Sequence, residues 1–335
     1  MQYKIAKKHW SYLMSNLERG ATALDEARRK RASMMLPKVD FEGFMKAREE
    51  DKANVKSASQ YQSEVIDYFY KDEQMQGVKL PWEKTFDQFR LRLGEVSLWS
   101  GINGHGKSQL VGQVINSIVQ QDFKVCVASF EMHPYSTLQR MTRQATGTEK
   151  PTEKFIGEYF TFLDNRLYMY DQQGTVNGER VIAVLYYVAE TLGVQHFVID
   201  SLMKCGVRSD DMNAQKEFLD KLCAAARDLN VHVHLIAHSR KGEDEFSPPN
   251  KMDVAGSADI TNQVDNVMTV WRNKKKEKLI RSGKAKEEEL NAPDCLLICD
   301  KQRHGEWEGE IALWFDAPSM RYKGSQHEKV WQLKF

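Results

Sequence analysis

The chain has 335 residues, and its formal net charge at neutral pH is only +1. Hydrophobic residues make up 41% and charged residues 28%, which is ordinary for a soluble globular protein. The near-zero net charge excludes a global basic field for nucleic acid, so any such contact has to be local. The apolar stretches are too short to cross a bilayer, and we expect no membrane partner.

The N-terminus and the cysteines both indicate a protein of the cytoplasm. The N-terminal residues are basic but lack the apolar segment of a secretory signal. The five cysteines are odd in number, and Cys295 and Cys299 do not have the spacing of zinc ligands. We therefore expect reduced thiols in an apolar core.

Residues 1–76 form the first region in chain order. They are polar and show helical spacing in places, with Tyr61, Val65 and Phe69 on one predicted helical face. This pattern predicts a small helical appendage or linker. Pro81 follows and marks the boundary to a second domain, residues 77–335.

From residue 77 onward, short apolar runs alternate with longer amphipathic segments. Strands are predicted at 95–100, 124–130, 195–199, 231–237, 267–271, 295–299 and 310–315, with helices at 107–120, 135–146, 178–192 and 214–230. The alternation predicts an α/β fold, a doubly wound and mostly parallel sheet flanked by helices. The last strands follow each other with little helix between them, which favours an antiparallel edge.

A phosphate-binding loop follows the first predicted strand. Gly101, Gly106, Lys107 and Ser108 have the spacing of a P-loop, and a predicted helix begins at Lys107. The glycines let backbone N–H groups turn toward the phosphates, Lys107 reaches the outer phosphates, and Ser108 ligates Mg²⁺. We therefore expect ATP and Mg²⁺ as cofactors. The expected nucleotide-binding residues are Gly101, Asn103, Gly104, His105, Gly106, Lys107, Ser108 and Gln109.

Two carboxylates follow later strands and are candidates for the chemistry. Asp200 comes directly after the predicted strand 195–199 and is the expected second metal-binding group. Glu131 follows the strand 124–130 and is a candidate for activating water. From its position alone, Glu131 is equally an ordinary acid at the start of the helix 135–146.

Six short motifs, in a fixed order, resemble one family. Residues 77–322 resemble the RecA-like motor domain of ring-forming replicative helicases, namely bacterial DnaB, its phage relatives and mitochondrial Twinkle. The motifs are Gly104-His-Gly-Lys-Ser108, Ser129-Phe-Glu-Met132, Phe197-Val-Ile-Asp-Ser201, His234-Leu-Ile-Ala-His-Ser-Arg-Lys241, Gly256-Ser-Ala-Asp259 and Lys301-Gln-Arg-His-Gly305.

The resemblance implies roles for several residues. Glu131 is similar to the catalytic glutamate, and His238 to the sensor of the γ-phosphate; the alternative for His238 is a buried histidine that ends the strand. Arg303 resembles an arginine finger and Lys301 its companion, both acting on the nucleotide of the neighbouring subunit. Phe315 is at a position similar to that of a residue that touches the base.

The loop after His238 is the candidate DNA contact. Arg240, Lys241 and Lys251 suit tracking of a single-stranded phosphate backbone without sequence readout. The alternative is an ordinary charged surface loop, since the same segment contains Glu243 and Asp244.

The resemblance implies an ATP-driven helicase, a homo-hexameric ring that translocates on single-stranded DNA, with primase or a helicase loader as further partners. Residues 1–76 do not look like a DnaB N-terminal collar, which favours a phage or prophage helicase. Two alternatives remain, a RadA- or RecA-like recombination ATPase and a non-motor ATP-binding accessory protein or loader. The Lys/Glu-rich segment 273–289 indicates no function.

Overall fold

A computed structural model describes residues 56–70, 77–207, 211–239, 246–249, 258–330 and 332–335. The chain divides into two compact units, Met1–Lys71 and Asp72–Phe335. The described part of the first unit is helical, with a 3₁₀ turn η1 (Ala58–Tyr61) followed by α3 (Gln62–Tyr70). The second unit contains the predicted P-loop and the strands around it.

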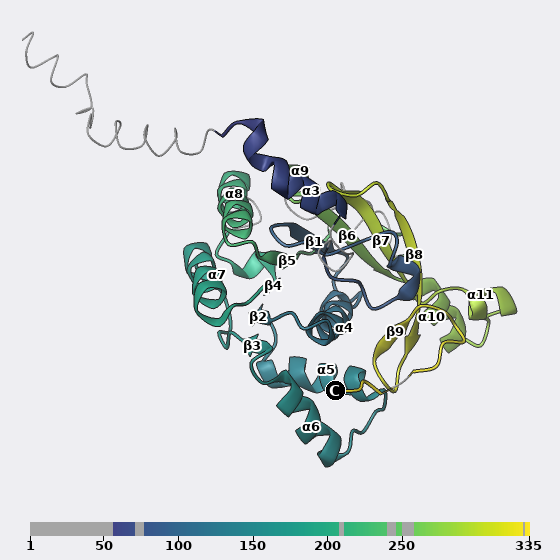
Figure 1. Cartoon of the computed structure of the whole chain (residues 1–335). Coiled ribbons are helices and arrows are strands. Elements are labelled where there is room, and N and C mark those ends of the chain that lie inside the picture. Colours follow the sequence, from purple (N-terminus) through teal and green to yellow (C-terminus); the bar gives the residue numbers. More distant parts are fainter. Residues whose placement is uncertain (1–55, 71–76, 208–210, 240–245, 250–257, 331) are drawn as a thin grey trace, which may run out of the picture. The chain divides into compact units, whose positions relative to one another are not determined.

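The second unit is built on one nine-stranded sheet with the order β3-β2-β4-β5-β1-β6-β7-β8-β9 (Figure 1). The strands are β1 (Val96–Ser100), β2 (Val125–Ser129), β3 (Leu167–Met169), β4 (His196–Asp200), β5 (His232–Ile236), β6 (Asn266–Arg272), β7 (Cys295–Gln302), β8 (Gly309–Asp316) and β9 (Arg321–Lys323). The pairings from β3 to β6 are parallel, and those from β6 to β9 are antiparallel. The predicted α/β fold, its mostly parallel sheet and its antiparallel edge are confirmed.

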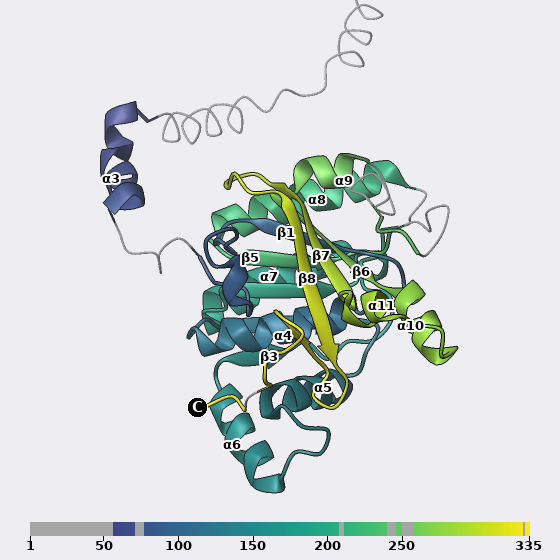
Figure 2. The same cartoon turned by 90° about the vertical axis from the view of Figure 1, so that its right-hand side faces the viewer.

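Helices cover both faces of this sheet, as Figure 2 shows from the side. They are α4 (Lys107–Gln120), α5 (Pro134–Thr146), α6 (Glu153–Leu163), α7 (Gly178–Leu192), α8 (Met212–Asp228), α9 (Ala258–Gln263), α10 (Lys274–Arg281) and α11 (Glu287–Asn291), with 3₁₀ turns η3 (Glu83–Thr85) and η4 (Leu202–Lys204). Side chains alternate along each strand, so Trp99 packs into the core under α4, α5 and α6. Its neighbour Leu98 packs into the core under α7, α8 and α9.

Several elements of the fold are not predicted from sequence. The strands β3 and β9 have three residues each, too few for an alternating pattern to be recognised. The charged segment 273–289 contains α10 and α11, whose helical form is not marked by an apolar period. The five cysteines are free thiols and all are buried, as predicted. In the described ranges, no helix combines the length and the hydropathy needed to span a membrane.

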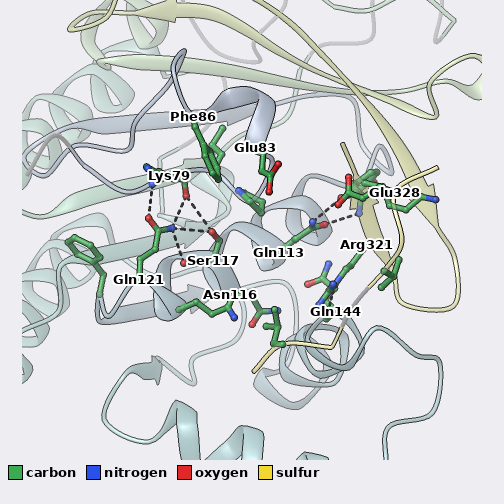
Figure 3. A pocket seen from close by; sticks show the side chains of 18 of the residues that line it. Lys79, Glu83, Phe86, Gln113, Asn116, Ser117, Gln121, Gln144, Arg321 and Glu328 are labelled. Carbon is green, nitrogen blue, oxygen red and sulfur yellow. Dashed lines mark hydrogen bonds between the residues drawn. The ribbon is translucent and has the colours of Figure 1, made fainter. Parts of the chain in front are cut away.

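Two glutamines of α4 fix the segments that pack behind the P-loop (Figure 3). The Gln113 amide donates to the Tyr322 carbonyl at 2.9 Å and accepts from the Tyr322 N–H at 2.8 Å. The Gln121 amide makes the same pair of bonds to Lys79, both at 2.9 Å. These residues border a cavity of about 880 Å³ that Arg321 also lines. The first of these clamps holds β9 against the helix that follows the P-loop.

Three buried histidines lie side by side on β4 and β5. The Trp99 indole, which can only donate, donates to Nδ1 of His234 at 3.3 Å, so the His234 proton is on Nε2. His234 therefore donates to Nδ1 of His196 at 3.1 Å. His232 bonds the Ser97 hydroxyl at 2.9 Å. Burial lowers the pKa of His232 to about 4 and holds the pKa values of His196 and His234 well below the usual range. All three imidazoles are thus neutral in the folded protein.

This cluster predicts a loss of stability in mild acid. In the unfolded chain His196, His232 and His234 titrate near pH 6.5, whereas in the folded chain they titrate lower. Their contribution is complete above about pH 6.5 and is lost as the pH falls toward about 4, by at most about 1.4 kcal/mol per pH unit for each histidine. Buried Glu95 and Asp200 have raised pKa values and act with the opposite sign. Urea unfolding at about pH 7.5 and about pH 5.5 measures the balance. We expect a lower midpoint in acid, and equal midpoints would contradict neutral imidazoles.

Candidate nucleotide-binding site

The P-loop connects the carboxyl end of β1 to the first residue of α4. Gly101 and Gly106 have φ values of 150° and 87°, which glycine adopts without strain. A Cβ at Gly101 would lie 2.3 Å from the Val270 carbonyl oxygen, and one at Gly106 would lie 2.4 Å from the Tyr322 hydroxyl. Strands β6 and β9 therefore press directly on the loop, and only glycine fits at these two positions. The N–H groups of the first turn of α4 have no intrahelical partner and suit an anion.

Lys107 lies at the centre of the site and is only 5% exposed. Its ammonium donates to the carbonyls of Gly101 at 2.8 Å and Ile102 at 3.2 Å, and to Nδ1 of His238 at 3.1 Å. Burial lowers the pKa of Lys107 to about 8, although Asp200 and Glu131 act in the opposite direction. The ammonium is thus held across the loop by acceptors that a phosphate could replace or supplement.

The two predicted carboxylates meet at the same edge of the sheet. Strands β2 and β4 are in register with Ser129 opposite Asp200, and Glu131 follows β2 by two residues. Asp200 is 6% exposed, and burial raises its pKa, an effect that the Ser108 hydroxyl opposes. Glu131 accepts a hydrogen bond at 2.7 Å from the hydroxyl of Ser201, the residue after Asp200. The parallel register therefore brings together side chains that are far apart in sequence.

His238 joins the lysine to the glutamate. Because the Lys107 ammonium can only donate, Nδ1 of His238 accepts and the imidazole proton is on Nε2. This Nε2 lies 3.7 Å from the nearer carboxylate oxygen of Glu131. Burial and the charge of Lys107 lower the pKa of His238, so the imidazole is neutral at pH 7. His238, predicted as a sensor, is thus in contact with Lys107 and close to Glu131.

The other predicted nucleotide-binding residues occupy different parts of the loop. Asn103 and Gly104 are exposed at its tip. The His105 side chain is 1% exposed and accepts from the Arg272 N–H at 3.1 Å. Burial and the nearby cations, led by Lys274, lower the pKa of His105 to about 4. Its imidazole anchors the loop to the end of β6, a role that spacing could not reveal.

On the other side of the loop, the antiparallel edge of the sheet supplies two aromatic rings. Phe315, the predicted base contact, is partly buried with its ring 5.3 Å from that of Tyr322. Tyr322 is the ring that borders Gly106, and it is not predicted because it lies on the three-residue strand β9. Gln109 donates to the Met320 carbonyl at 3.1 Å, in the turn before β9.

Arg303 and Lys301 lie at the opposite edge of the sheet from the P-loop. The Lys301 ammonium donates to the Val264 carbonyl at 2.7 Å, and the Arg303 guanidinium pairs with Asp265 at 3.0 Å. Asp265 in turn accepts from the N–H of Val96, the first residue of β1. The P-loop follows the other end of this strand, about 15 Å away at roughly 3.3 Å per residue. These two cations are therefore not brought to the phosphate loop of their own chain.

The predicted DNA-contacting residues Arg240, Lys241 and Lys251 lie outside the residues that the structure describes. So do Gly256 and Ser257 of the fifth motif.

Comparison with known proteins places this geometry in a family. The model of the DnaB-like helicase C-terminal domain matches residues 84–324. Among solved structures, one ATPase domain is similar with a TM-score of 0.67 and 15% identity, covering 80% of this chain and 99% of that one. A DnaB-like replicative helicase, described with its interactions with primase, has a TM-score of 0.64 and 15% identity, covering 91% of this chain and 78% of that one.

The P-loop, the paired carboxylates and the mostly parallel sheet define a RecA-like P-loop ATPase. The family match extends over most of the chain, and the chain belongs to the DnaB-like helicase C-terminal domain family. It is a DnaB-like replicative helicase motor, which couples ATP hydrolysis to the unwinding of DNA.

The lowered pKa of Lys107 predicts that nucleotide affinity depends on pH. Above about pH 8 the free protein loses the ammonium proton, whereas a bound polyphosphate favours the charged form. Binding then takes up a proton, and the dissociation constant for ADP rises by up to roughly tenfold per pH unit. Titrations of a fluorescent ADP analogue at about pH 7, 8 and 9 measure this. The same series with Lys107→Arg should be flat, because a guanidinium keeps its proton. A wild-type constant that is unchanged to pH 9 would contradict the buried ammonium.

Proposed function

We propose that this protein is a ring-forming ATP-dependent DNA helicase whose nucleotide sites lie between adjacent copies of the chain. The observation that carries the proposal is the separation of Arg303 from the P-loop. Its guanidinium pairs with Asp265 at the start of β6, whereas Lys107 follows the far end of β1. A cation at that edge can reach a phosphate only on a second copy. A ring of identical subunits repeats this head-to-tail contact and closes it.

The residues at the carboxyl edge fit a magnesium–nucleotide complex. Asp200 is a buried carboxylate close to the Ser108 hydroxyl, and both are oxygen ligands of the kind that Mg²⁺ prefers. Burial alone raises the pKa of Asp200, which a dication would offset. We propose that Ser108 and Asp200 hold Mg²⁺, directly or through water. When bound, this ion would neutralise phosphate charge.

Hydrolysis is divided among four side chains of the site. Lys107 and the N–H groups of the first turn of α4 bind the phosphates. Glu131 orients the attacking water and accepts its proton, while Ser201 fixes the carboxylate by its 2.7 Å hydrogen bond. His238 bridges Lys107 and Glu131, so a change in the bonds of one affects the other. We propose that this bridge reports the γ-phosphate to the chain after β5.

A mixing experiment tests the composite site. Lys107→Ala should lose nucleotide binding and ATPase activity. Arg303→Ala should bind nucleotide normally but lose most of its DNA-stimulated ATPase, by about 10³-fold or more. Mixed in equal amounts, the two inactive variants re-form interfaces with an intact P-loop on one side and an intact arginine on the other. The ATPase activity of the mixture should therefore exceed the sum of the separate variants.

The matched control is Arg180→Ala, which removes an exposed guanidinium on α7 and should leave the ATPase activity unchanged. Activity of the mixture equal to the sum would show that Arg303 stabilises only its own chain through Asp265.

We propose that single-stranded DNA binds the segment after His238 through Arg240, Lys241 and Lys251. Support comes from the sequence, because these cations follow directly on the strand that carries His238. A nucleotide-dependent change at His238 would thereby reach the DNA contact. Primase is the partner protein to test first, because a similar DnaB-like helicase is described together with its interactions with primase.

Replacing Arg240, Lys241 and Lys251 together by alanine should weaken single-stranded DNA binding without changing nucleotide affinity. Three lost phosphate contacts should lower the slope of log affinity against log salt by about 2. Fluorescence anisotropy of a labelled oligonucleotide over a salt series measures both quantities. The matched control replaces three exposed lysines of the α10–α11 segment, Lys275, Lys284 and Lys286. Equal losses in both triple variants would contradict a local DNA site.

A further inference from the structure

One half-buried guanidinium close to the nucleotide site has no role in the mechanism above. Arg140 lies on α5, the helix that follows Glu131. Its Nη2 is 3.4 Å from the Met132 sulfur. Within the described ranges, no carboxylate forms an ion pair with it. A thioether is a weak acceptor, so the guanidinium has given up part of its hydration without a strong partner.

The packing of α5 on α4 places Arg140 at the start of α4. Gln144, one turn further along α5, donates to the Gln109 carbonyl at 2.9 Å and to the Met320 carbonyl at 3.1 Å. Arg140 shares this face because it is four residues earlier. Since α5 leaves the carboxyl edge of the sheet, the earlier residue is nearer to that edge. This puts Arg140 beside the first turn of α4, where Lys107 and Ser108 lie.

Three borders of the phosphate site surround this guanidinium. Met132, its hydrogen-bond partner, is the residue after Glu131. Asp200 and Tyr322 are the two groups whose charges favour the protonated guanidinium against the effect of burial on its pKa. The Tyr322 hydroxyl borders Gly106 of the P-loop. Arg140 is therefore enclosed by the metal-binding carboxylate, the loop and the segment of the catalytic glutamate.

We propose that Arg140 binds phosphate oxygens of the nucleotide held by its own chain. The inference rests on the nucleotide site proposed above and adds a cation in cis to the one that Arg303 supplies from the neighbouring copy. A phosphate oxygen replaces the thioether with a charged acceptor that matches the planar guanidinium fork. A lysine, with one compact ammonium, fills this role only in part.

The test compares ATP binding by Arg140→Ala, Arg140→Met and Arg140→Lys, with Arg180→Ala on exposed α7 as the matched control. Calorimetry should give dissociation constants about 10- to 100-fold weaker for the alanine and methionine variants. The lysine variant should lie between them and the wild type, and the control should equal the wild type. Melting temperatures without nucleotide should change little, because methionine keeps the contact with Met132. Constants within twofold of the wild type in both variants would overturn the proposal.

A second measurement uses the wild-type protein and does not depend on the folding of variants. Phenylglyoxal modifies exposed guanidinium groups, and mass spectrometry gives the rate at each arginine. ATP should slow modification of Arg140 at least tenfold and leave Arg180 unaffected. An Arg140 rate that ATP does not change overturns the inference while nucleotide binding itself remains intact. A wild type that binds no ATP would instead overturn the proposed nucleotide site.

Discussion

The site depends on a desolvated ammonium whose position is fixed by three bonds. Lys107 is buried and donates to two carbonyls of its own loop and to His238. This geometry requires that β1 and β5 are adjacent and parallel, with Trp99 opposite Ile236, because only then do the loop and His238 leave the sheet at the same edge. The cost of burying a cation is offset by these acceptors and by the nearby carboxylates. Any shift of β5 relative to β1 would therefore change the bonds of the phosphate-binding lysine.

The antiparallel edge gives the motor two functional ends. Strand β7 runs opposite to β6, so the residues at its end lie beside the start of β1 rather than beside the P-loop. Lys301 and Arg303 meet the carbonyls that end α9 and the carboxylate of Asp265. The same edge returns through β8 and β9 to place Tyr322 against Gly106. One chain thus presents a phosphate loop at one edge and cations at the other, which suits head-to-tail assembly.

Features marked by local patterns are predictable from sequence, and features made by distant contacts are not. The predicted bounds of α4 and α7 agree with the structure because a glycine lies just outside or at the end of each apolar period. Asp200 and Glu131 are found because each follows a strand with a clear apolar run. Tyr322 is missed because β9 is too short to show a period. Arg140 is missed because only the packing of α5 on α4 brings it to the P-loop.

The central claim is that each nucleotide lies between two copies of this chain. The most direct measurement is a cryo-electron microscopy structure with a non-hydrolysable ATP analogue and single-stranded DNA. The account predicts a closed ring in which Arg303 of one subunit has left Asp265 and lies within hydrogen-bond distance of the γ-phosphate held by Lys107 of the next. A monomer with nucleotide bound, or a ring in which Arg303 stays paired with Asp265 at every interface, would contradict it.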